Sequence, residues 1–131
     1  MIEELREIYE AGARLRGVNE RRDSGLAGAI VQLDLNFDFC CIAISVSDED
    51  ELKFKIFHAD TEFTKSSLIW ESLLGQRLFG YWSMQNQLGY MDAVQLTFGD
   101  DTSSLDRDAI QIQAVSSGIA VYKVVDQSDI A

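Results

Sequence analysis

The stretch Val31-Gln-Leu-Asp-Leu-Asn-Phe-Asp-Phe39 decides which fold this chain can adopt. Apolar residues occupy its odd positions and polar residues its even positions, which is typical of a strand with one buried face. At Cys40-Cys41 the pattern shifts by one residue, and the even positions of 42–46 become the apolar ones. Because a one-residue shift moves each side chain to the opposite face, the sequence predicts a hairpin turn at 36–38 between two antiparallel strands.

The same alternation continues outward from this hairpin. The acidic run Asp48–Glu51 predicts a turn, and residues 52–56 alternate again, which predicts a third strand. After residue 77 the pattern predicts four more short strands, separated by turn residues, over 78–85, 90–98, 109–113 and 119–125. We therefore expect two meanders that form a twisted antiparallel sheet of about six to seven strands.

Two segments have the spacing of helices instead. In residues 3–16, apolar side chains recur every three or four positions, and Gly17 is a natural end for that helix. Within Thr64–Gly75 the pattern predicts a short helix between the two meanders, with Ser66 or Ser67 as its cap and Gly75 at its end. The predicted fold is a single α+β domain over residues 1–131.

The composition excludes several classes of function. The 131 residues carry a formal net charge of −11, and the Arg and Glu residues of 1–22 balance, so the excess negative charge lies after them. Such a chain repels phosphate, so we expect no nucleic-acid binding, whereas a basic protein partner is compatible with it.

The charge-free stretches, the first residues and the cysteines predict where in the cell the protein is located. The longest charge-free stretches, Leu78–Met91 and Ala109–Tyr122, are shorter than the roughly 20 apolar residues that span a bilayer. The first residues are charged and amphipathic, unlike a secretory signal. Cys40 and Cys41 are adjacent and are the only cysteines, so they cannot form a disulfide that links distant segments of the chain. We therefore expect a cytoplasmic protein that is not membrane-bound.

No complete catalytic or metal-binding set is visible in the sequence. His58 is the single histidine, and Asp60 is the carboxylate nearest to it in the sequence. A general base needs an orienting partner, and zinc sites need several His or Cys ligands, so a histidine at the rim of a sheet is the favoured interpretation. The strand setting of Cys40 and Cys41 offers no cation that would activate a thiolate. We expect no catalytic residues, no cofactor and no metal.

The stretch Trp82–Phe98 holds the remaining candidates. Asp92 shares its parity with Val94 and Leu96, so we expect its carboxylate to face the apolar side, where it must be hydrogen-bonded or paired. In the favoured interpretation Asp92 accepts hydrogen bonds from the backbone of the turn at 86–89. In the alternative, Asp92 lines a pocket or partner site together with Asn86, Tyr81 and Tyr90.

This stretch also brings a resemblance. The motif Asn86-x-x-Gly89-Tyr90-x-Asp92, followed by alternating residues, resembles a family of small uncharacterised bacterial proteins over about residues 76–125. The resemblance implies a bacterial, cytoplasmic α+β domain, and it implies no activity.

The sequence is therefore compatible with three functions. The first is a non-catalytic protein-interaction module of unknown partner, which could be a homodimer, with Trp70, Tyr81, Trp82 and Tyr90 at the interface. The second is an immunity-like or antitoxin-like inhibitor whose acidic surface blocks a basic toxin site. The third is a small-molecule-binding protein with a pocket near Asp92.

Overall fold

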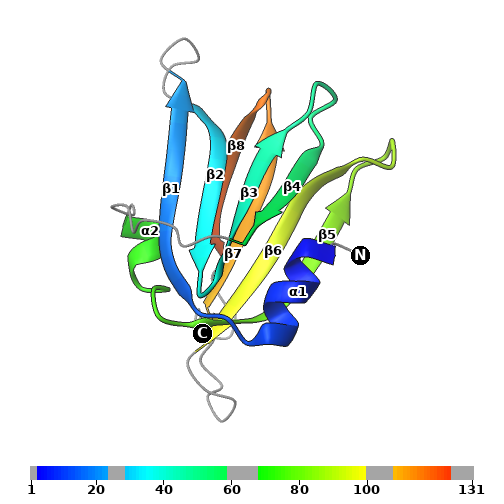
Figure 1. Ribbon diagram of the computed structural model, residues 1–131. Coiled ribbons are helices and arrows are strands. Elements are labelled where there is room, and N and C mark those ends of the chain that lie inside the picture. Colours follow the sequence, from blue (N-terminus) through cyan, green and yellow to red (C-terminus); the bar gives the residue numbers. More distant parts are fainter. Residues whose placement is uncertain (1–2, 24–28, 59–67, 100–107, 125–131) are drawn as a thin grey trace, which may run out of the picture.

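The computed structural model describes residues 3–23, 29–58, 68–99 and 108–124 (Figure 1). It contains the helices α1 (Glu3–Ala11) and α2 (Leu68–Glu71) and an antiparallel sheet. The strands are β1 (Leu15–Asp23), β2 (Ala29–Phe37), β3 (Cys40–Val46), β4 (Leu52–Phe57), β5 (Arg77–Gln85), β6 (Met91–Gly99), β7 (Asp108–Val115) and β8 (Gly118–Val124). The predicted α+β class, with a short helix between two sets of strands, is confirmed.

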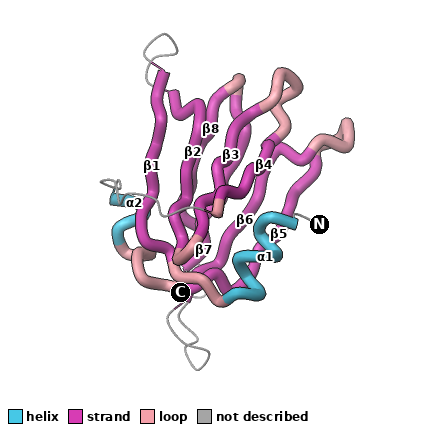
Figure 2. The backbone as a smooth tube through the Cα atoms, viewed as in Figure 1, coloured by secondary structure: helices cyan, strands magenta, loops and turns pink. Residues whose placement is uncertain are grey.

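The strands form one curled sheet (Figure 2). Their order is β4-β3-β2-β8-β7-β6-β5, and β1 pairs with the other edge of β2. β2 joins the two parts, since it pairs with β3 over 32–37 and meets β8 at Ile30 and Ile119. The sheet also curls back on itself, because the N–H of Leu15 donates to the carbonyl of Gln76 just before β5, at 2.9 Å.

The core lies inside this curl. Phe37 of β2 stacks on Phe98 of β6 with ring centroids 6.5 Å apart, so opposite parts of the sheet meet across it. The helices fill the remaining space: α1 contributes Leu5 and Ile8 to the core, and α2 contributes Trp70. In Figure 1, α1 lies beside β5 and β4, both of which it contacts.

The N-terminal segment differs from the prediction. The helix ends at Ala11, where Gly12 adopts a left-handed φ of 64°, and the chain then enters β1 instead of continuing as a helix to residue 16. Strand β1 was not predicted, because its sequence is mostly charged and lacks clear alternation. Pairing with β2 along its whole length overrides this weak local preference.

The first hairpin turn also differs in position. Phe37 pairs with Cys40, so the turn residues are Asp38 and Phe39 rather than 36–38. Phe39 is 85% exposed, although its parity predicted a buried side chain. Its backbone adopts a positive φ of 69°, which is uncommon for residues other than glycine. Within the described residues the second helix spans Leu68–Glu71, so it ends before Gly75, where we expected its end.

No helix within the described parts of the chain combines the length and the apolar character needed to span a bilayer.

Candidate interaction surface

Trp70, one of the residues expected at an interface, lies in the core. Its exposed fraction is 0%, and it packs in the same cluster as Leu73, one helical turn further along the chain. A side chain with this burial stabilises the fold and presents no surface to a partner. The structure therefore separates Trp70 from the other candidate interface residues.

The β5–β6 turn is held by Asn86. Its side-chain oxygen accepts hydrogen bonds from the N–H groups of Leu88, at 2.9 Å, and Tyr90, at 3.1 Å. The backbone N–H of Gly89 donates to the Asn86 carbonyl, and Gly89 supplies the left-handed φ of 85° that this turn needs. The prediction that Asp92 accepts the hydrogen bonds of this turn is therefore wrong for these donors, because Asn86 is closer in the chain and forms an Asx turn.

Asp92 lies at a β-bulge. The register of β5 and β6 passes from Met84 opposite Ala93 to Gln85 opposite Met91, which leaves Asp92 without a partner in the ladder. An extra residue resets the alternation of side chains, so Met91 packs against the core and Asp92 is half-buried. The strand parity that predicted an inward-facing Asp92 does not extend through the bulge.

The two candidate tyrosines have different surroundings. Tyr81 packs against the core and meets Tyr9 of α1 edge to face, with ring centroids 6.3 Å apart. Tyr90 is half-buried where the turn ends, and Asn86 binds its backbone N–H. These contacts assign Tyr81 to helix packing, and they do not gather the predicted group around Asp92 into one pocket.

Trp82 points to the opposite side of β5 from Tyr81. Its exposed fraction is 56%, and its indole ring lies over Gly80. A Cβ atom on Gly80 would lie 3.3 Å from the ring atom Cη2, a close contact, so the glycine leaves room for the indole to lie along the strand. Trp82 is thus the candidate that the structure places on an accessible surface.

Trp82 belongs to a row that crosses four strands. The register places Trp82 beside Gln95, Gln95 beside Gln111, and Gln111 beside Tyr122, which is 50% exposed. Neighbouring rows complete a surface that we call the β5–β8 outer face, with three residues from each strand. Its members are Gly80, Trp82, Met84, Ala93, Gln95, Thr97, Ala109, Gln111, Gln113, Ala120, Tyr122 and Val124. None of these twelve residues is charged.

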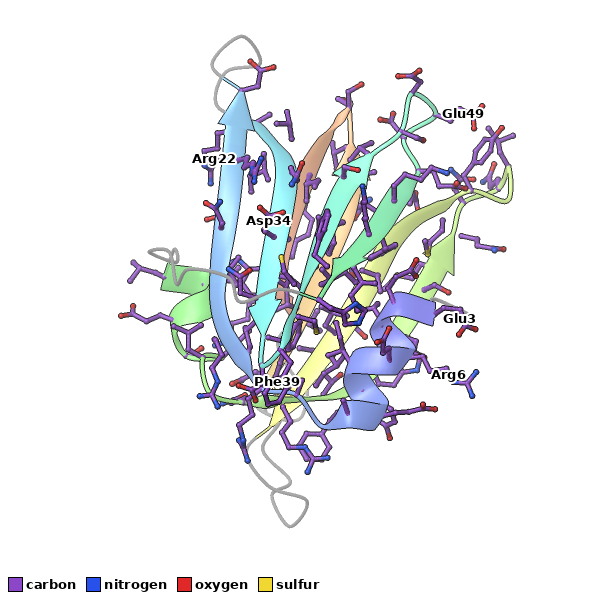
Figure 3. All side chains as sticks on the ribbon, viewed as in Figure 1. Glu3, Arg6, Arg22, Asp34, Phe39 and Glu49 are labelled. Atoms are coloured by element: carbon purple, nitrogen blue, oxygen red, sulfur yellow. The ribbon has the colours of Figure 1, made fainter. Side chains whose placement is uncertain are left out.

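The matching surface on the other strands is charged. The register of β1, β2, β3 and β4 defines the β1–β4 outer face, again with three residues from each strand. Its members are Gly17, Asn19, Arg21, Gln32, Asp34, Asn36, Cys41, Ala43, Ser45, Lys53, Lys55 and Phe57. Four of these twelve carry a charge, and Figure 3 labels one of them, Asp34 on β2.

The charges of the β1–β4 outer face are paired within the chain. Asp34 is 7% exposed, lies 3.2 Å from the Arg21 guanidinium and accepts a hydrogen bond from Gln32 at 2.8 Å. Lys53 forms an ion pair with Glu51 at 3.0 Å, and the Lys55 ammonium lies 5.1 Å from the ring centroid of Phe57. A depression of about 460 Å³ lies between the two lysines and the small residues of β3.

A second depression, of about 540 Å³, is acidic. It runs along α1 and is lined by Glu3, Glu4, Arg6, Glu7, Glu10 and Ile56; Figure 3 shows Glu3 and Arg6 on this helix. Beside it, the His58 Nε2 atom lies 2.7 Å from the Glu7 carboxylate. The predicted partner of His58, Asp60, lies outside the described residues. Neither depression is lined by Asp92.

The cysteines lack the properties of nucleophiles. Both are buried, and burial raises the pKa of Cys40 and raises that of Cys41 to about 11. A thiol with such a pKa stays protonated near neutral pH. Within the residues that the structure describes, no three His, Cys, Asp or Glu side chains come close enough together to hold a metal ion.

Sequence reasoning missed the β5–β8 outer face, although it contained a signal. The two longest charge-free stretches, Leu78–Met91 and Ala109–Tyr122, supply most of β5, β7 and β8. The sequence predicts strands in both stretches, but it does not predict that these strands are neighbours. A single strand shows that its own outer side chains are uncharged, but only the register shows that four such strands are neighbours.

Comparison with known proteins adds a family and no activity. Residues 3–128 match the model of a family that is described as a family of unknown function (DUF6334). No curated protein and no solved structure matches the chain significantly.

Proposed function

The chain belongs to this family of unknown function (DUF6334), and we propose that it is a non-catalytic protein-interaction module that docks through the β5–β8 outer face. One observation carries the proposal. This face is free of charge in a chain of which 25% of the residues are charged and whose net charge is −11. Depletion of charged residues at the centre and enrichment in Trp and Tyr are typical of protein interfaces.

The chemistry of the face supports a protein partner. Trp82 and Tyr122 lie at its two sides and combine large apolar area with few rotatable bonds. Between them, Gln95 and Gln111 can each donate and accept hydrogen bonds. A rigid sheet holds all four side chains in a fixed row, which lowers the entropy lost on binding.

The two alternative functions have less support. An inhibitor of a basic toxin site would use the acidic depression along α1, yet Arg6 lies within that depression and pairs with Glu10 at 3.0 Å. A small-molecule pocket near Asp92 would need Asn86 and Tyr81, whose contacts are made with the turn backbone and with Tyr9.

Site-specific photocrosslinking in the cells that produce the protein tests the proposal. A photoreactive amino acid replaces Gln111 on the β5–β8 outer face or, as the control, Gln87 in the exposed β5–β6 turn. We expect discrete protein adducts from position 111 and none from position 87. The adducts from position 111 should be lost when Gln95→Glu is added, because the added charge would be desolvated at the interface.

Equal adducts from both positions, or none from position 111, would refute docking through this face. The small-molecule-binding alternative would be supported instead by a low-molecular-weight ligand that raises the melting temperature of the chain and whose effect is lost with Asp92→Asn.

A further inference from the structure

We propose that the partner on the β5–β8 outer face is a second copy of this chain, packed sheet against sheet about a two-fold axis that runs parallel to the strands between β6 and β7. This inference rests on the proposed function, since it names the partner of the same surface. It is carried by the charge of the chain and by the order of side chains across the four strands.

The charge distribution favours this face for self-association. Two copies of a chain with a net charge of −11 repel each other, and most surfaces would bring like charges together. The β5–β8 outer face is the exception among the surfaces described above, because it contributes no charge from either copy. Repulsion is weakest in that orientation.

The central row is self-complementary. Its order across the sheet is Trp82, Gln95, Gln111, Tyr122, with aromatic rings at the two sides and amides in the middle. A two-fold axis along the strands exchanges the two sides of the row. Trp82 of one copy then lies over Tyr122 of the other, and Gln95 lies over Gln111. Each amide has both a donor and an acceptor group, so two glutamines can satisfy each other.

The flanking rows fit the same axis by size. One flanking row runs from Gly80 on β5 to Val124 on β8, and the other runs from Met84 on β5 to Ala120 on β8. The two-fold axis sets Met84 over Ala120 and Gln113 over Ala93, so that a larger side chain meets a small residue in both pairs, and it sets Val124 against the Trp82 indole that lies over Gly80. Interdigitation of this kind is how two sheets pack face to face at about 10 Å.

The size of the face indicates a weak dimer. Stable interfaces use about 20–30 residues from each partner, and this face offers twelve. We therefore expect a reversible dimer whose population depends on protein concentration, rather than a permanent one.

Sedimentation velocity over a concentration series tests for the dimer, and ionic strength tests its cause. Raising the salt from about 0.01 M to about 0.1 M shortens the Debye length from about 30 Å to about 10 Å. Because screening removes the repulsion between two acidic copies, the dimer should become stronger with salt. Association through opposite charges would become weaker, and that result would overturn the proposal.

Charge substitutions test the face. Gln95→Glu with Gln111→Glu sets two pairs of carboxylates against each other across the axis, and we expect dimerisation to weaken by at least about 100-fold. The control, Ser72→Glu with Gln87→Glu, adds the same net charge at exposed positions away from the face and should retain the dimer. Unfolding curves of both variants should match the wild type, which separates lost association from lost folding.

The orientation of the axis has its own test. In Gln95→Lys with Gln111→Glu, an axis parallel to the strands pairs each ammonium with a carboxylate of the other copy, so the dimer should persist. An axis perpendicular to the strands would instead set lysine over lysine and glutamate over glutamate, and the dimer would be lost. Loss of the dimer in this variant would overturn the proposed axis.

A chain that stays monomeric at several hundred micromolar under all of these salt conditions would overturn self-association. The proposed function would then still be decided by the photocrosslinking experiment, in which adducts with other proteins from position 111 would support it. The two proposals therefore fail on different observations.

Discussion

The β1–β4 outer face and the β5–β8 outer face have the same backbone design, with four antiparallel strands that each contribute three outward residues. They differ in side-chain chemistry. The first face has four charged residues, whose side chains pair with one another or with neighbours such as Glu51 and Phe57. The second face has no charge, and on it the Gln111 side-chain amide donates a hydrogen bond to the Gln113 side-chain oxygen at 3.1 Å.

On the β1–β4 outer face the four charged side chains have partners within the chain, which stabilises local geometry. The β5–β8 outer face has no charge to pair, and this is the difference on which the proposed docking function rests. Measuring the stability of variants tests whether each residue belongs to the part of the molecule to which we assign it.

The largest expected effect compares the two tryptophans. Trp70→Ala leaves a cavity in the core and should lower the free energy of unfolding by about 3–5 kcal/mol. Trp82→Ala removes a half-exposed ring and should cost less than about 1 kcal/mol. Urea denaturation followed by circular dichroism measures both.

If the alanine variant does not fold, Trp70→Phe offers a milder substitution in the core. Trp70→Phe should still lower the free energy of unfolding by more than Trp82→Ala does. Equal losses at the two tryptophans would show that Trp82 has a structural role, which would remove the distinction between core and docking surface.

The next effect concerns Asp38, which ties the β2–β3 turn to β1. Hydrogen bonds from the Arg16 side chain at 2.6 Å and the Arg14 N–H at 3.1 Å hold the pKa of Asp38 below its usual value. Stability from Asp38 is therefore complete above the unfolded pKa of about 4 and is lost as the pH falls through the lower folded pKa. Asp38→Asn should cost about 1 kcal/mol at pH 7.

The pH dependence sharpens this prediction. The difference between the wild type and Asp38→Asn should shrink in unfolding experiments as the pH falls through the lowered folded pKa of Asp38. A difference that is independent of pH would mean that the charge of Asp38 contributes nothing to stability.

The pKa of Glu51 is also lowered, by hydrogen bonds from the Lys53 ammonium and from the Met91 N–H. Glu51→Gln should therefore also reduce the stability gained above pH 4.

A comparable effect is expected in the β5–β6 turn. Asn86→Ala removes the acceptor of two backbone hydrogen bonds and should cost about 1 kcal/mol. Asp92→Asn, at the bulge, should change the free energy of unfolding by less than about 0.5 kcal/mol. If thermal or urea unfolding gave the reverse order, Asp92 would be the residue that holds the turn.

The smallest expected effect is a gain in stability. Phe39 is exposed and has a left-handed φ, so Phe39→Gly should stabilise the chain by about 0.5–1 kcal/mol. Phe57→Gly, the control in strand β4, should destabilise it by more than this amount, because it removes a partly buried ring that lies 5.1 Å from the Lys55 ammonium as well as adding a strand glycine. A loss of stability from Phe39→Gly would show that contacts of the Phe39 ring outweigh the backbone strain.

Much of the fold could be predicted because its strands alternate within themselves. The pattern from Val31 to Val46 predicts the first hairpin, and the alternation in Tyr90–Phe98 predicts most of β6. Strand β1 could not be predicted, because most of its residues are polar or charged and show no regular alternation. Leu15 and Val18 become core residues only because β1 pairs with β2. The bulge at Asp92 likewise depends on how β5 and β6 pair.

The candidate site was predicted only in part for the same reason. Trp82 and Trp70 were both predicted at an interface because tryptophan is enriched there, although Trp70 lies in the core. Residue type does not distinguish a buried ring from an exposed one; burial depends on which segments pack against it.

The amino-acid sequence by itself determined the class of fold, the negative charge and the strands that lack charge, because these follow from residue type and from a period of two along the chain. The tertiary structure decided which strands are neighbours, and therefore that Trp82, Gln95, Gln111 and Tyr122 form one row. Side chains on separate strands become a surface only through hydrogen-bonded register, which is a long-range property of the folded chain.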